Sequence, residues 1–267
     1  MSKVVLITGA SSGIGKSTAE YLYLKGMNVY GTSRKPKKEQ INGVKMLALD
    51  VTDVQSIENA VSVIISKEKR IDVLINNAGM GITGPIEDTP TQEMRKVFDT
   101  NLFGAIDVMK AVLPQMRAQG DGLIINVTSI AGYMGLPFRG LYSATKGALE
   151  LITEATRMEV KDFGIDITNV APGDFATNIA AGRYHTPIFE DSVYKDKYAN
   201  NLALIDADVD GGMSPNVMAK KVHKIICTST PKGHYKVGSF MEKFSIVLKR
   251  ILPDSVYEKL LMNHYKL

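Results

Sequence analysis

Short apolar runs alternate along the chain with longer segments in which apolar residues recur every three or four positions. In six of the runs Val, Ile and Leu follow one another almost without polar alternation, which is typical of strands covered on both faces. The runs, with a seventh near the C-terminus, are residues 3–8, 27–33, 44–51, 72–78, 122–129, 165–172 and 234–238. We predict that they form the strands of one largely buried sheet.

The intervening segments carry helical periodicity. Apolar residues repeat at helical spacing in 54–66 and form a longer stripe over 94–116, and a further sheet-covering helix is expected after residue 216. Alternation of strand and helix implies right-handed crossovers and a doubly wound parallel α/β sheet. Because no Pro-, Gly- or Ser-rich boundary interrupts the chain, we predict one domain over residues 1–267.

Two regions depart from this alternation. Residues 174–215 mix aromatic, acidic and glycine residues, and a connection of this length is usually functional or contains its own helices. We assign them as a substrate loop that follows a cofactor-binding and catalytic core over 1–173. The tail, 240–267, is expected to form two amphipathic helices divided by Pro253, with Asp254 or Ser255 as a cap.

Composition narrows the class of protein. The net charge is +4, and the basic residues are scattered apart from 33–38 and the tail, so we expect no nucleic-acid partner. One cysteine, Cys227, cannot form an internal disulfide, which fits a reducing compartment. The N-terminus lacks a signal-peptide pattern and no apolar window is long enough to span a bilayer, so a cytoplasmic location is expected.

A glycine-rich turn follows the first apolar run. The sequence TGASSGIG, with Gly9, Ser11, Ser12, Gly13, Ile14 and Gly15, leads directly into a helical segment. Glycines at this spacing permit a tight turn and a close approach of the backbone to a pyrophosphate at the helix N-terminus. Its place at the start of a doubly wound pattern favours a dinucleotide site over a simple turn.

The residues at the end of the second strand indicate which nicotinamide cofactor to expect. An acidic residue there would bind the ribose 2′-hydroxyl of NAD, whereas this chain has Ser33 and Arg34, which suit the 2′-phosphate of NADP. We therefore predict NADP(H) rather than NAD(H), although a solvated basic loop is the other interpretation. Asp50 and Val51 are placed to meet the adenine, and Asp50 could equally cap the helix that starts near residue 53.

Together with the glycine turn, NNAG (76–79), Ser129 and YSATK (142–146) make the chain closely similar to the short-chain dehydrogenase/reductase family. The similarity covers about residues 3–180 and extends more loosely to 240. It implies a Rossmann-type seven-stranded sheet and a nicotinamide cofactor. It also implies a catalytic group of Asn101, Ser129, Tyr142 and Lys146. Taken singly, Ser129 could be only a strand-end turn residue and Asn101 a surface amide.

The implied roles fit the residue types. Hydride transfer to a carbonyl develops negative charge on oxygen, and Tyr142 would supply the proton as general acid. Lys146, one helical turn further, would hold the nicotinamide ribose and, together with the oxidised nicotinamide, move the tyrosine pKa down toward the working range. Ser129 would polarise the substrate carbonyl, and Asn101 would hold a water of a proton relay to Lys146.

The family pattern extends to further cofactor contacts. It implies that Asn77, Ala78 and Gly79 line the ribose and lock the fourth strand, that Pro172 and Gly173 face the nicotinamide, and that Thr177 lies near the carboxamide or pyrophosphate. Asp174 is unusual after this glycine, and it is either a turn former or a polar feature of the substrate mouth. No metal site is expected.

Loops at the strand ends point to the substrate. Their apolar residues, which could also simply bury the loops, are Met80, Ile82, Tyr133, Met134, Leu136, Phe138 and Ile179. They favour a lipophilic carbonyl or alcohol, steroid-like or acyl-chain, over a small sugar. The family resemblance suggests a homodimer or homotetramer through the helices at 94–116 and 142–162. The tail could contact a membrane surface, act as a lid or mediate self-association. The intact catalytic group argues against a catalytically silent NADP-binding protein.

Overall fold

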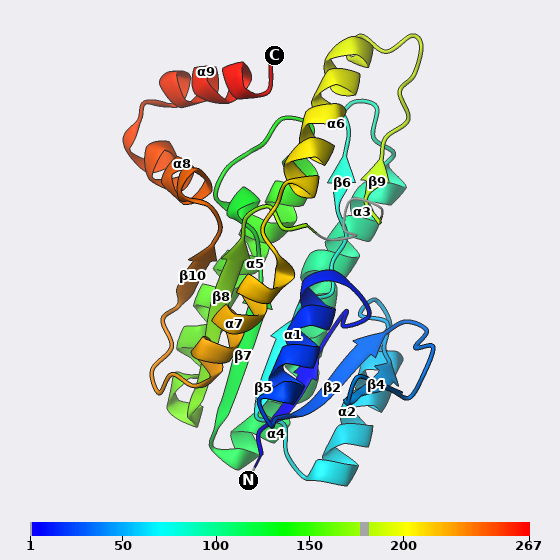
Figure 1. Cartoon of the computed structure of the whole chain (residues 1–267), viewed down its shortest axis with the longest axis vertical. Coiled ribbons are helices and arrows are strands. Elements are labelled where there is room, and N and C mark those ends of the chain that lie inside the picture. The colour runs from blue at the N-terminus through cyan, green and yellow to red at the C-terminus, as the bar shows by residue number, and fades with distance from the viewer. Residues whose placement is uncertain (1, 177–181) are drawn as a thin grey trace.

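The protein is described by a computed structural model that covers residues 2–176 and 182–267, with the backbone alone for 206–210. Its central sheet runs in the order β10-β8-β7-β5-β1-β2-β4-β3 (Figure 1). The strands are β1 (Val4–Ile7), β2 (Asn28–Ser33), β3 (Gln40–Ile41), β4 (Val44–Ala48), β5 (Val73–Asn76), β7 (Gly122–Val127), β8 (Ile165–Pro172) and β10 (His234–Val237). All of them pair in parallel except β3, a two-residue antiparallel edge that the apolar pattern did not indicate. The seven predicted parallel strands are therefore confirmed.

Helices cover both faces of the sheet (Figure 1). α1 (Gly13–Leu24) and α7 (Pro215–Ile226) pack on one face, where Leu22, Val222 and Ile225 join a core with Val5 and Ile125. α2 (Val54–Glu68) and α4 (Gly104–Gln119) pack on the other face against Leu6 and Ile124. α5 (Gly140–Glu159) contacts β8 along this second layer. These buried strands explain the near-continuous Val, Ile and Leu runs in the sequence.

The segment predicted as one helix over 94–116 is interrupted. α3 (Thr91–Phe98) passes into a π-helix at Asp99–Phe103 before α4 begins. A π-turn inserts one residue into the helical repeat and is frequent at functional sites. The apolar stripe continues on both sides of this insertion, which is why periodicity alone gave a single helix.

The remaining elements lie beyond the carboxyl ends of the strands (Figure 1). β6 (Ile82–Thr83) pairs in parallel with β9 (Tyr184–His185), and α6 (Lys195–Asp210) follows in the predicted substrate loop. The tail forms α8 (Phe240–Ile251) and α9 (Asp254–His264), as expected. The expected cap is wrong: Pro253 occupies the N-cap of α9 without a side-chain bond, and Asp254 instead pairs with Lys249 at 2.7 Å.

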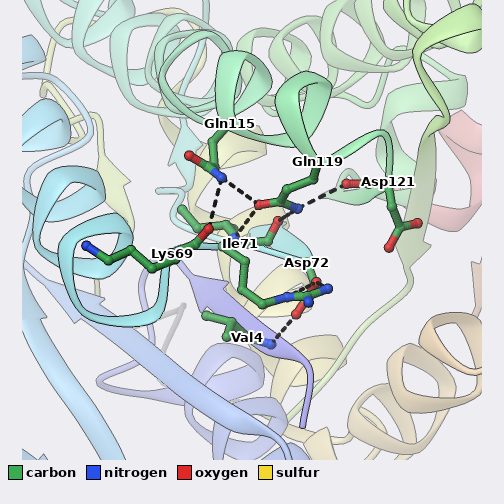
Figure 2. Close-up of polar contacts among 8 residues, drawn as sticks. Val4, Lys69, Ile71, Asp72, Gln115, Gln119 and Asp121 are labelled. Carbon is green, nitrogen blue, oxygen red and sulfur yellow. Dashed lines mark hydrogen bonds and ion pairs between the residues drawn. The ribbon is translucent and has the colours of Figure 1, made fainter. Parts of the chain in front are cut away.

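A polar network closes the opposite, amino-terminal edge of the sheet (Figure 2). The Gln119 side chain accepts from the Ile71 amide at 2.9 Å and donates to the Ile71 carbonyl at 3.1 Å. Gln115 donates to Gln119 and to the Lys69 carbonyl, and Asp72 accepts from the Val4 amide at 2.6 Å. These bonds fix the loop before β5 against the end of α4 and the start of β1, so this edge serves stability.

Candidate active site

The glycine turn between β1 and α1 is shaped by close backbone contacts. Gly9 and Gly13 have φ of +67° and +54°, and a Cβ on Gly15 would lie 2.3 Å from the Gly9 oxygen. Ser12 stands at the N-cap of α1, and its side chain makes no capping bond within the described part of the chain. The first amides of a helix have no intrahelical partner and can bind an anion. Ser11, Ser12 and Gly13 line a surface cavity of about 450 Å³ there. This geometry fits a pyrophosphate.

Asn77 ties this turn to the end of β5. Its side-chain nitrogen donates to the oxygens of Thr8 and Gly9 at 2.9 and 3.1 Å. The Thr8 hydroxyl in turn accepts from the amides of Asn77 and Ala78, both at 3.0 Å. Asn77 and Ala78 therefore lock β5, as the family pattern implied, and they do so against the turn itself.

The end of β2 contains a polar group suited to the 2′-phosphate. The Ser33 hydroxyl is buried and has no hydrogen-bond partner among the described residues, and the exposed Arg34 forms no ion pair with any of them. Asp50 is already bonded, because it accepts from the amide and hydroxyl of Thr52 at 3.0 and 2.8 Å. The cap of α2 is Asp53 rather than Asp50, and Val51 is buried beside it.

Asn101 lies within the π-helix and is almost fully buried. Its side chain accepts from the Met80 amide at 2.8 Å and donates to the Met80 carbonyl at 2.9 Å. It also donates to Thr145 on α5 at 3.2 Å. Gly79 closes the group, since a Cβ there would lie 3.1 Å from the Asn101 oxygen and 3.5 Å from Lys146 Nζ. Asn101 is therefore an internal link between α5 and the loop after β5, and the alternative of a surface amide is wrong.

α5 directs Tyr142 and Lys146 to the same side. Lys146 Nζ lies 5.9 Å from the centre of the Tyr142 ring and donates to the Val127 carbonyl at 3.0 Å. Ser129 follows β7; its hydroxyl accepts from the Ala131 amide at 3.1 Å, at the start of a 3₁₀ turn over Ile130–Tyr133, and donates to the Pro172 carbonyl at 3.5 Å. It also lies close enough to the Tyr142 phenol to act on the pKa of that group. The structure thus brings Asn101, Ser129, Tyr142 and Lys146 to the carboxyl ends of β5 and β7, beside the point where the sheet order reverses.

The pKa of Tyr142 differs from the expectation. Protein packed around the half-buried phenol raises its pKa, while the Ser129 hydrogen bond and the charges of Arg139 and Arg183 act in the opposite direction. Lys146 is not among the groups that shift this pKa, so its expected contribution is not found, and removal from water outweighs the charges of Arg139 and Arg183. Burial also lowers the pKa of Lys146 itself to about 8.

A pocket of about 440 Å³ opens from Ser129 and Tyr142 toward the tail. Ile82, Met134 and Leu136 line it as predicted, and so does Ile14 of the glycine turn. Met80, Tyr133 and Phe138 are not part of its wall, and Thr177 and Ile179 lie outside the described residues. Pro172, Gly173 and Asp174 also line it, so Asp174 faces this pocket.

Several wall residues were missed by sequence reasoning. A Cβ on Gly173 would lie 2.0 Å from a carboxylate oxygen of Glu242, which also accepts from the Asp174 amide at 2.5 Å. Arg139 bonds the Tyr265 hydroxyl, and Arg183 also lines the pocket. The capping box of Ser239 and Glu242 was readable as a helix start, but its contact with Gly173 depends on how the tail folds back.

A nucleotide-type crevice combined with a Ser–Tyr–Lys group defines an oxidoreductase that acts on alcohols and carbonyls. The chain belongs to the short-chain dehydrogenase family, whose model, described as short chain dehydrogenase, matches residues 3–187.

Known proteins agree with this membership. The chain is 42% identical to a 3-ketodihydrosphingosine reductase of Bacteroides thetaiotaomicron over 98% of both chains. A short-chain dehydrogenase structure from Streptomyces avermitilis has a TM-score of 0.83 at 30% identity, and the match covers 99% of this chain and 97% of that one. The structure of ElxO with NADP bound has a TM-score of 0.72, also at 30% identity, over 89% of this chain and 96% of that one.

Proposed function

We propose that the protein is an NADP(H)-dependent oxidoreductase that interconverts a lipophilic ketone and its alcohol, with Tyr142 as general acid and base. The observation that carries the proposal is the pocket of about 440 Å³, which joins Ser129 and Tyr142 to a wall rich in apolar side chains from α8 and α9. A cavity of this kind excludes water and suits an extended hydrocarbon better than a sugar.

The residues have distinct roles in the reduction. NADPH, when bound, supplies the hydride. The hydroxyls of Ser129 and Tyr142 hydrogen-bond the carbonyl oxygen, and Tyr142 transfers its proton to that oxygen as negative charge develops. A raised pKa keeps Tyr142 protonated and therefore ready to donate. Lys146 places an ammonium beside the phenolate that remains, and Asn101 holds the adjacent Met80 backbone.

The cofactor assignment rests on the end of β2. Ser33 offers a buried hydroxyl without a partner among the described residues, and Arg34 offers an exposed guanidinium that can grip a phosphate. The NADP-bound structure of ElxO supports the same choice. Pro172 and Gly173 would face the nicotinamide, while Gly9, Gly13 and Gly15 would hold the pyrophosphate.

Arg34→Ala tests the cofactor. We expect NADPH to bind well ahead of NADH in the unmodified protein, and the variant to lose about tenfold or more in NADPH affinity while NADH affinity changes little. Fluorescence titration of both nucleotides measures this, with Lys67→Met on α2 as a surface-charge control. Equal affinities in the unmodified protein would overturn the assignment.

The substrate class rests on the pocket and on the reductase of 3-ketodihydrosphingosine to which the chain is 42% identical. We infer that the substrate is a long-chain ketone. Residues 174–215 would form the substrate loop, since Phe175 and Arg183 reach the pocket wall.

NADPH oxidation should be followed with 3-ketodihydrosphingosine, a steroid ketone and a small sugar. Activity confined to the sugar would contradict a lipophilic substrate, and turnover undiminished in Tyr142→Phe would remove Tyr142 as the acid.

A further inference from the structure

α8 has apolar residues on two faces, and only one of them is covered. Ile246 points inward and packs with Tyr257 and Ile130. Phe240, Phe244, Val247 and Ile251, spaced four, three and four residues apart, form a stripe along the outside of the helix. Their exposed fractions are 73%, 39%, 45% and 68%, and the rings of Phe240 and Phe244 stack with centroids 5.6 Å apart. We call these four residues the α8 stripe.

The α8 stripe adjoins the mouth of the substrate pocket. Met241 and Leu260 line the pocket and are nevertheless 67% and 47% exposed. Met241 follows Phe240 directly, and Leu260 belongs to α9, whose Val256 and Met262 are also exposed. The exposed apolar surface of the two tail helices therefore continues through Met241 and Leu260 into the pocket. A hydrocarbon chain could pass from this surface into the pocket.

Positive charge flanks the α8 stripe. Lys243 and Arg250 are exposed on the same side of α8, and neither forms an ion pair within the described part of the chain. Residues 240–267 contain the basic residues Lys243, Lys249, Arg250, Lys259 and Lys266 and the acidic residues Glu242, Asp254 and Glu258, five against three. Glu242 is directed inward, where it accepts from the amides of Asp174 and Ser239. The outer surface is therefore more basic than the count suggests.

We propose that α8 and α9 rest on an anionic membrane surface, so that the pocket opens onto the lipid from which it takes its substrate. A helix with an apolar stripe and basic flanks lies in the interface plane. In the described part of the chain no helix has the length and hydropathy to cross a bilayer, so the contact is peripheral. A two-fold contact of the α8 stripe with itself would bring the basic surfaces of two copies together, which disfavours self-association here.

The test measures vesicle binding by the full chain, without nucleotide or ketone. Vesicles of phosphatidylcholine with about 30% phosphatidylglycerol should co-sediment the protein, and those of phosphatidylcholine alone should bind much less. Phe240→Ser with Phe244→Ser should weaken binding about tenfold or more. Lys243→Glu with Arg250→Glu should remove the preference for anionic lipid. Leu24→Ser with Val54→Ser, exposed apolar positions on α1 and α2, should bind like the unmodified protein.

Three results would overturn the proposal. The first is that the unmodified protein does not co-sediment with vesicles, and the second is that its binding does not depend on lipid charge. The third is that the phenylalanine substitutions convert an oligomer to a monomer in sedimentation velocity, which would assign the stripe to a contact with a second copy.

The delivery of substrate from the membrane to the pocket rests on the proposed function and has its own readout. Turnover of a vesicle-embedded long-chain ketone should fall in the phenylalanine variant, while turnover of a short soluble ketone stays unchanged. Absence of both turnovers in the unmodified protein, with its vesicle binding intact, would count against the proposed function alone.

Discussion

Lys146 is a charged side chain held in the interior, with 5% of its surface exposed. Burial lowers its pKa from 10.5 to about 8, which corresponds to roughly 3 kcal/mol of disfavoured protonation in the folded state. Between these two pH values the unfolded chain binds more protons at this residue than the folded chain does. The contribution of Lys146 to stability therefore rises with pH over that window and is least favourable below pH 8.

Lys146→Met should expose this dependence. At pH 7 the substitution removes the free-energy cost of a buried ammonium and so stabilises the variant relative to the unmodified protein. This advantage in the free energy of unfolding should shrink by about 2 kcal/mol as the pH is raised to about 10, because the unmodified protein then becomes more stable. Urea unfolding at both pH values measures the difference. Lys67→Met, on the exposed side of α2, should give the same small difference at both. A Lys146→Met difference independent of pH would contradict the assigned pKa.

Ser129 accepts from the Ala131 amide and donates to the Pro172 carbonyl, so its hydroxyl is held beside Tyr142 before any substrate arrives. Ser129→Ala should lower kcat/KM for ketone reduction by about 10²–10³, as the loss of one preorganised donor does elsewhere, with nucleotide affinity retained. Ser143→Ala is a matched control, because Ser143 is buried next to Tyr142 and its hydroxyl has no partner among the described residues. Equal rates for both variants would assign Ser129 to the turn alone.

The residues of the site were predictable to different degrees. The one-turn spacing of Tyr142 and Lys146 and the glycine turn are local features, and the structure keeps them. Arg139 and Glu242 reach the pocket through contacts with Tyr265 and Gly173 that lie far apart in the sequence. The raised pKa of Tyr142 depends on the density of packing around it, which no spacing reveals.

At the scale of elements, the buried strands were predictable because Val, Ile and Leu dominate both faces of a parallel sheet. The π-helix at Asp99–Phe103 was not, since it keeps the apolar stripe of α3 and α4 nearly in phase. It allows the Asn101 side chain to bond both backbone groups of Met80, and tertiary contact rather than local preference sets this geometry. β3 is a two-residue edge and is too short for any pattern to indicate.

The polar network at the amino-terminal edge makes a prediction about stability alone. Gln119→Ala would leave the amide and carbonyl of the fully buried Ile71 without their side-chain partner. We expect a loss of about 2–4 kcal/mol in the free energy of unfolding, since each buried polar group left unpaired costs about 1–3 kcal/mol. Denaturant unfolding measures this, and kcat at low temperature should be unchanged because the site lies at the other edge of the sheet. Gln55→Ala, an exposed glutamine on α2, is the control.

At the scale of the whole molecule, the core and the C-terminal tail contribute different parts of the site. The sheet with its glycine turn provides a nucleotide crevice at its carboxyl edge, and the tail closes the space above it. Asn201 of α6 donates to the Tyr265 carbonyl at 2.7 Å, and Arg139 bonds the Tyr265 hydroxyl, so α6 and the core both hold the C-terminus. Such long-range closure explains why the sequence indicated an apolar substrate but assigned several of the wrong wall residues.

The apolar residues left exposed on α5 bear on assembly. Leu151 and Met158, seven residues apart on one side of α5, are 67% and 73% exposed, and Phe103, the last residue of the π-helix before α4, is 54% exposed. We therefore keep the prediction of a homo-oligomer formed through α4 and α5, a face separate from the α8 stripe. Leu151→Lys with Met158→Lys should convert it to a monomer by placing like charges opposite each other across a two-fold contact. Light scattering of purified protein measures the mass, and Leu24→Lys, equally exposed on α1, should leave it unchanged. A monomeric unmodified protein would contradict the prediction, whereas an oligomer unaffected by both substitutions would move the interface to another face.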